Sequence, residues 1–179
     1  MVIVAGIDPA GSPKKYTGVA VLDNYTLLCI ARVKKDEEIT SIIHKYKPVV
    51  IAIDSPLSHA PGYRKVDIAM KIHGYQVLPP GWRSMRMLID RSLRLKKLFE
   101  ERGAIVIETH PRSALKSSGC KNPEDLYNRI GFHIEKPLSK DENDALISAI
   151  VALYYAIGDV IEISDVDGTI YLLPPVCRS

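Results

Sequence analysis

Residues 2–10 read VIVAGIDPA, and this stretch decides the fold because its pattern returns twice along the chain. Residues 49–56 read VVIAIDSP, and residues 104–111 read AIVIETHP. Each run is apolar and rich in β-branched residues, and it ends in a carboxylate with a proline close by, as is typical of a buried strand that stops at a turn. If the three strands are parallel neighbours, their acids meet at the carboxyl edge of one sheet, where open α/β folds place their sites. These acids are Asp8, Asp54 and Glu108.

The composition is that of an ordinary globular protein. With 179 residues, 46% hydrophobic and 25% charged, the chain predicts a single domain spanning 1–179 and excludes disordered and fibrous classes. The net charge of +3 permits an anionic partner without requiring one. No apolar run approaches the roughly 18 residues that span a bilayer, so we expect no membrane association. The three cysteines lack metal-type spacing and no leader precedes the first strand, which together predict a cytoplasmic protein with free thiols.

The remaining elements predict a mixed α/β architecture. Strands at 17–22 and 26–32 would form an antiparallel meander with the first strand, and the tail at 159–173 would form a C-terminal hairpin. A loop or cap insertion is expected at about 55–81. Helices are expected at 36–46, 63–73 within the insertion, 82–102, 122–130 and 139–157, the last opened by a Ser139–Glu142 capping box.

The last helix contributes two further acids. Asp141 and Asp144 fall near one of its faces, beside a strip of small residues at 145, 149 and 152 that would let the helix approach the sheet closely. Asp144 would then reach the strand ends. Asp141 lies in the first turn, where the helix dipole favours an acid whatever the function, so its role as a ligand stays open.

Four converging carboxylates with no lysine or arginine between them repel one another unless cations neutralise them. Ligand sets made only of oxygen suit Mg²⁺ or Mn²⁺. Two such ions roughly 4 Å apart could hold a phosphodiester, activate a water and stabilise the leaving oxygen. The ligand set therefore favours hydrolytic phosphoryl transfer.

The order of elements resembles the ribonuclease H-like fold, which carries acids on its first strand, at the end of its fourth and on a late helix. Asp8 in GIDPA, Asp54 in AIDSP and Asp144 in DENDAL match these places. The whole chain also resembles an uncharacterised family of predicted nucleases with this fold, through residues 53–57, 64–67, 108–111 and 144–146. The resemblance implies a metal-dependent nuclease that acts on DNA or RNA.

Several residues near the expected site have two possible roles. Arg64, with Asp67 three residues on, would clamp a phosphate or form a local ion pair that orders the loop. His110 would carry a proton or neighbour a metal, or else make a structural hydrogen bond. Arg83 begins a row of basic residues on the 82–102 helix, but acids interrupt the row, which favours an ordinary solvated face. The basic residues of this row are Arg83, Arg86, Arg91, Arg94 and Lys97.

The leading hypothesis is a Mg²⁺- or Mn²⁺-dependent hydrolase of nucleic-acid phosphodiesters. Asp8, Asp54 and Asp144 would hold metal, and Glu108 would be a fourth ligand or orient water. A second hypothesis is a nucleic-acid- or protein-binding module that keeps the fold without catalysis. A third is a nucleotide-binding phosphotransferase-like domain, which would need a second domain or a homodimer to build its cleft. The sequence is compatible with a homodimer under each of these hypotheses.

Overall fold

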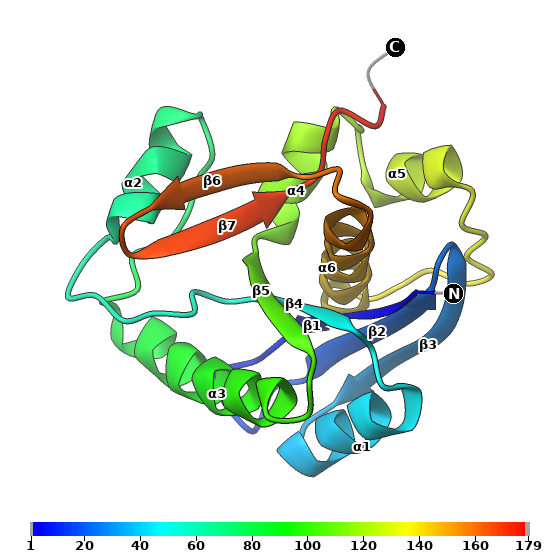
Figure 1. Ribbon diagram of the computed structural model, residues 1–179, viewed down its shortest axis with the longest axis horizontal. Coiled ribbons are helices and arrows are strands. Elements are labelled where there is room, and N and C mark those ends of the chain that lie inside the picture. The colour runs from blue at the N-terminus through cyan, green and yellow to red at the C-terminus, as the bar shows by residue number, and fades with distance from the viewer. Residues whose placement is uncertain (1, 178–179) are drawn as a thin grey trace.

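The computed structural model describes residues 2–177, which form a mixed seven-stranded sheet with helices on both faces (Figure 1). The strand order is β3-β2-β1-β4-β5-β7-β6. The strands are β1 (Ile3–Asp8), β2 (Thr17–Asp23), β3 (Thr26–Val33), β4 (Val50–Asp54), β5 (Ile105–Thr109), β6 (Ile161–Asp165) and β7 (Gly168–Leu172). The helices are α1 (Asp36–Tyr46), α2 (Lys65–Ile72), α3 (Arg83–Glu100), α4 (Pro111–Ser118), α5 (Pro123–Ile130) and α6 (Lys140–Ile157). The predicted meander and C-terminal hairpin are both present, at opposite sides of the sheet.

The central strands are apolar throughout because both faces of the sheet are covered. Along β4, Val50 and Ala52 belong to a core shared with α6, whereas Ile51 and Ile53 belong to a second core shared with α1 and α3. Alternation of side chains across a strand places successive residues in different cores. The continuous apolar runs that identify the strands in the sequence therefore reflect burial on two sides.

The three acid-tipped strands are neighbours and run parallel, as predicted. Ile7 of β1 pairs with Ile53 of β4, so Asp8 and Asp54 lie at the same level on the carboxyl edge. Glu108 of β5 pairs with Ile53 instead, one residue earlier than Asp54. Because side chains alternate along a strand, this offset of one residue turns Glu108 toward the face opposite Asp54. The register thus separates the third acid from the first two.

Helix α4 was not predicted from the sequence. It begins with Pro111 at its first turn and ends at Gly119, which adopts a left-handed backbone with φ of 74°. Proline at the start and glycine just past the end are the ordinary marks of a short helix, so the signal was present at residues 111–119. The other helices begin and end within two residues of the expected positions.

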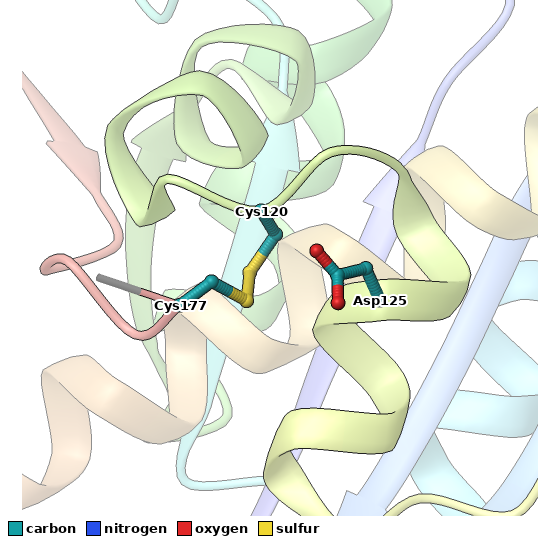
Figure 2. A group of neighbouring side chains, drawn as sticks. All are labelled: Cys120, Asp125 and Cys177. Atoms are coloured by element: carbon teal, nitrogen blue, oxygen red, sulfur yellow. A yellow bond between two sulfur atoms is a disulfide. The ribbon is translucent and has the colours of Figure 1, made fainter. Parts of the chain in front are cut away.

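The prediction of three free thiols was wrong. Cys120 and Cys177 form a disulfide that ties the chain after β7 to the turn between α4 and α5, with Asp125 close by (Figure 2). Cys29 is the free cysteine of the described residues. The two bonded cysteines lie 57 residues apart in sequence, and a pairing at that separation leaves no local pattern. Between Val2 and Cys177, none of the helices is both long and apolar enough to cross a membrane.

Candidate metal centre

Three of the predicted acids meet at the carboxyl edge of the sheet. Asp8 from β1, Asp54 from β4 and Asp144 from α6 each offer a carboxylate oxygen, and these oxygens all lie within 4.8 Å of one another. Each of the three residues is partly buried. We call these residues the acid cluster.

Glycines in the sheet bring Asp144 to the strand ends. A Cβ at Gly6 of β1 would overlap the backbone of Ala145 and Ala149 in α6, and a Cβ at Gly18 of β2 would overlap the backbone of Asp141. Helix α6 therefore lies directly against the strands, closer than side chains would allow. The predicted close approach of the strip of small residues is confirmed, with Ala145 and Ala149 against Gly6 and all three alanines of the strip buried. The role of Gly6 and Gly18 was not predicted from the sequence.

The acid cluster is electrostatically costly without a cation. Burial, followed by the nearby charge of Asp144, raises the pKa of Asp8 to about 7. Burial is also the largest cause for Asp54, whose pKa lies well above its ordinary value, and the charges of Asp8 and Asp144 raise it further. A divalent cation bound between these carboxyls would offset their mutual repulsion and favour their charged forms.

One lysine does reach the cluster, contrary to the expectation that no cation lies among the acids. Lys140 Nζ lies 2.6 Å from Asp144 Oδ2, although the lysine side chain itself is 84% exposed. The hydrogen bond to Asp144 raises the pKa of Lys140, and the charge of Lys140 offsets part of the rise in the pKa of Asp8. An ion pair with an exposed lysine contributes little stability, so a metal ion can displace Lys140 from Asp144 at small cost.

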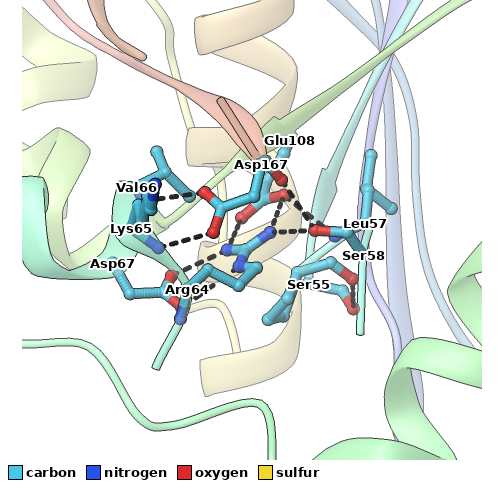
Figure 3. A network of polar contacts seen from close by, with 10 residues as sticks. Ser55, Leu57, Ser58, Arg64, Lys65, Val66, Asp67, Glu108 and Asp167 are labelled. Carbon is cyan, nitrogen blue, oxygen red and sulfur yellow. Dashed lines mark hydrogen bonds and ion pairs between the residues drawn. The ribbon is translucent and has the colours of Figure 1, made fainter. Parts of the chain in front are cut away.

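Glu108 is engaged by Arg64 in a buried ionic network (Figure 3). The Arg64 guanidinium is 2% exposed and donates to both oxygens of Glu108 and both oxygens of Asp67. Glu108 also accepts a hydrogen bond from the backbone N–H of Leu57 at 2.8 Å. Burial raises the pKa of Glu108, while Arg64 lowers it. Of the two interpretations of Arg64, the structure shows the ion pair, with its donors engaged by Asp67, Glu108 and the Ser58 hydroxyl.

The network joins the insertion to the sheet. Arg64 precedes α2, and Asp67 accepts hydrogen bonds from the Arg64 backbone and side chain in the first turn of that helix. Asp167, from the turn between β6 and β7, accepts from the backbone N–H groups of Lys65 and Val66 (Figure 3). The start of α2 is thus held from two sides, and the segment beside the acid cluster has a fixed position.

The other predicted residues lie around the cluster. Asp141 pairs with Arg32 of β3 at 3.1 Å and is partly exposed. His110 precedes α4, its Nδ1 lies 2.6 Å from Ser113 Oγ, and burial lowers its pKa. Arg83 is exposed at the start of α3. The structure therefore gathers Asp8, Asp54 and Asp144 in one cluster and places Asp141, Glu108 and Arg83 outside it.

Arg91 corrects the expected solvent-facing row on α3. Its guanidinium is buried and donates to the carbonyl of Ala10, the hydroxyl of Thr17, the carbonyl of Lys34 and the carboxylate of Asp36. Ala10 is two residues beyond Asp8, so Arg91 fixes the loop that follows the first acid. Its partners are 55 to 81 residues away in sequence, and helical spacing alone gave no sign of them.

Two cavities meet at Asp8. They are a pocket of about 200 Å³, which we call the inner pocket and which Asp54 also lines, and a wider groove of about 520 Å³, which we call the basic groove. The inner pocket is lined by Asp8, Pro9, Asp54, Ser55, Pro56, Arg64, Asp67, Val77, Leu78, Met85, Leu88, Glu108, Thr109, His110 and Ile170. The basic groove is lined by Asp8, Pro9, Ala10, Gly11, Lys14, Lys15, Tyr16, Arg32, Lys140 and Asp141.

Known structures share the fold. A Thermus thermophilus RuvC structure in complex with Holliday junction substrate superposes with a TM-score of 0.58, and a second RuvC structure from that organism does so with 0.56. Each is 20% identical in sequence, and the match covers 88% of this chain and 97% of the RuvC chain. No protein-family model matches the sequence, and no curated protein matches it either. The likeness establishes the ribonuclease H-like fold predicted from the order of the elements.

Proposed function

We propose that the protein is a divalent-metal-dependent nuclease that hydrolyses phosphodiester bonds of DNA or RNA. The observation that carries the proposal is the acid cluster, because three carboxylate oxygens within 4.8 Å form an oxygen-only ligand set at the carboxyl edge of the sheet. The fold shared with RuvC, whose structure holds a Holliday junction substrate, supports a nucleic-acid substrate. A bound Mg²⁺ or Mn²⁺ would supply a Lewis acid and an activated water at this edge.

Different residues of the chain would hold the ion and position the segments around it. Asp8, Asp54 and Asp144 would hold it, and Asp141 stands one helical turn from Asp144 as a further acid at the rim. Glu108 would act through Arg64 by fixing the insertion beside the cluster. A cytoplasmic location is also part of the proposal.

The test is a cleavage assay on the purified chain. Single-stranded DNA, duplex DNA, an RNA–DNA hybrid and a four-way junction are each incubated with Mg²⁺, with Mn²⁺ and with EDTA. We expect cleavage of at least one substrate with either metal and none with EDTA. Calorimetric titration with Mn²⁺ is run in parallel, since binding without cleavage of any substrate would favour the non-catalytic module, and no binding at millimolar Mn²⁺ would overturn the metal site.

The raised pKa values predict how the metal-free protein responds to pH. Asp8 has an ordinary value of 3.8 and a folded value of about 7, so the folded state binds more protons than the unfolded state between these limits. The contribution of Asp8 to the free energy of unfolding has its full value below about pH 4 and is lost as the pH rises through about 7. We expect the thermal midpoint of Asp54→Asn to exceed that of wild type by a margin that grows over this window.

Differential scanning fluorimetry in EDTA and in Mn²⁺ measures this effect. Comparison with Asp54→Asn cancels the contribution of titrating groups that do not interact with the acid cluster, so the difference reports the cluster itself. We expect Mn²⁺ to stabilise wild type more at pH 8 than at pH 5, because protons compete for the ligand oxygens, and to leave the variant unchanged. A stabilisation by Mn²⁺ that is equal at both pH values, or equal in the variant, would contradict the prediction.

A further inference from the structure

The inner pocket has the wrong charge for a phosphate. Four carboxylates line it, and two of them, Asp8 and Asp54, belong to the acid cluster that a metal would neutralise. The remaining charged lining is Arg64 with Asp67 and Glu108, and Arg64 is paired with both of these acids. A phosphate placed in the pocket beyond the acid cluster would therefore meet net negative charge in a partly desolvated site, which is unfavourable.

The walls of the pocket suit a flat, neutral group. Val77 and Leu78 of the insertion, together with Met85 and Leu88 of α3, line it with apolar side chains. The volume of about 200 Å³ is below the roughly 300–1,000 Å³ of pockets that hold drug-sized ligands, so it admits a group of one or two rings. His110 lines the same pocket and can meet the edge of such a ring by a hydrogen bond.

The basic groove, which Asp8 also lines, has an excess of positive charge. Four cationic side chains line it against the carboxylates of Asp8 and Asp141. Arg32 pairs with Asp141 and Lys140 with Asp144, so Lys14 and Lys15 supply the excess. Arg32 also lies 4.2 Å from the centre of the Tyr16 ring. These cations come from three separate parts of the chain, namely Lys14 with Lys15, Arg32, and Lys140. Phosphates of a nucleic-acid backbone bind such a surface by charge, independently of sequence.

We propose that the inner pocket receives one unpaired nucleobase of the substrate, while the adjacent backbone phosphates lie in the basic groove and the phosphodiester between them lies at the acid cluster. This proposal rests on the proposed nuclease function and names its substrate class: nucleic acid with an unpaired nucleotide at the cleaved position. A base inside a regular duplex cannot enter the pocket without leaving its stack. Single strands, bulges and branch points offer such a base at low cost.

The experiment compares three duplexes that differ at one position: fully paired, with one bulged nucleotide, and with an abasic residue in the bulge. We expect the bulged substrate to be cleaved at least about tenfold faster than the other two, since tenfold corresponds to about 1.4 kcal/mol and burial of one base by stacking and packing supplies a contribution of that order. Equal rates on the bulged and abasic substrates would overturn the base pocket while leaving the nuclease proposal intact.

A matched pair of variants tests the pocket itself. Met85→Trp fills the pocket, whereas Met87→Trp places the same side chain at a position of α3 that is 51% exposed. We expect Met85→Trp to lose the preference for the bulged substrate and Met87→Trp to keep it, with both binding Mn²⁺ as wild type does. If Met85→Trp does not fold, the abasic comparison decides alone.

A binding measurement separates failure of the pocket from failure of the nuclease. With Ca²⁺ in place of Mn²⁺, a bulged duplex that carries 2-aminopurine in the bulge is titrated with protein. We expect a change in 2-aminopurine fluorescence with wild type that is absent with Met85→Trp. If wild type cleaves nothing but gives this signal, the base pocket stands and the nuclease proposal fails; no signal in wild type would overturn the pocket.

Discussion

Asp54→Asn is expected to lower the rate of phosphodiester cleavage by at least about 10³-fold while keeping or raising thermal stability. A metal in a hydrolytic site contributes several kcal/mol of transition-state stabilisation, and about 4 kcal/mol corresponds to that factor. Asp54 lies on the strand between those of Asp8 and Glu108, and its carboxylate oxygen lies within 4.8 Å of those of Asp8 and Asp144. Asparagine has nearly the same side-chain shape as aspartate, but it lacks the negative charge that binds a cation.

The gain in stability separates this result from simple unfolding. The pKa of Asp54 is raised because its charge is buried beside two other acids, and removing the charge removes that repulsion. Glu100→Gln is the control, since the carboxylate of Glu100 lies at the surface, where it pairs with Lys96. The control is expected to match wild type in rate and thermal midpoint. Persistent cleavage by Asp54→Asn with either metal would contradict the assignment of the acid cluster.

Arg64→Met is expected to lower the free energy of unfolding by about 3–5 kcal/mol, the usual consequence of removing one partner from a buried ionic network. Both Asp67 and Glu108 would lose the guanidinium that neutralises them, and each is nearly fully buried. Urea denaturation monitored by circular dichroism measures the change.

Arg32→Met is the matched control for this prediction. Arg32 also pairs with a carboxylate, that of Asp141, but its side chain is 40% exposed. Exposed pairs contribute roughly 0–1 kcal/mol, so the control should unfold close to wild type. Equal effects of the two substitutions would show that burial of the Arg64 network contributes nothing. A double variant, Arg64→Met with Glu108→Gln, is expected to recover part of the loss because one uncompensated charge is removed.

Much of the architecture could be predicted because it depends on local patterns. The run from Val2 to Ala10 and its two repeats gave the parallel strands, since a strand buried on both faces must be apolar throughout. The capping box at Ser139 gave the start of α6 for a similarly local reason, because its hydrogen bonds join residues three apart. Helix α4 was missed although its proline and glycine marks were present.

The partners of the charged residues could not be predicted in the same way. Arg64 and Glu108 are 44 residues apart, and Arg91 lies 81 residues from the carbonyl of Ala10 that it binds. A guanidinium on a helix looks the same in sequence whether it faces water or a buried carbonyl. The Cys120–Cys177 disulfide was missed for the same reason.

The sequence by itself determined that Asp8 and Asp54 stand at the ends of buried parallel strands and that Asp144 lies on the helix facing them, because hydrophobic periodicity and helical spacing are properties of neighbouring residues. Only the tertiary structure decided which acids form the cluster. A register offset of one residue turned Glu108 toward Arg64, and two glycines in the sheet let α6 carry Asp144 to Asp8. Register and helix-to-sheet distance depend on contacts between distant segments, and those contacts leave no periodic pattern in the chain.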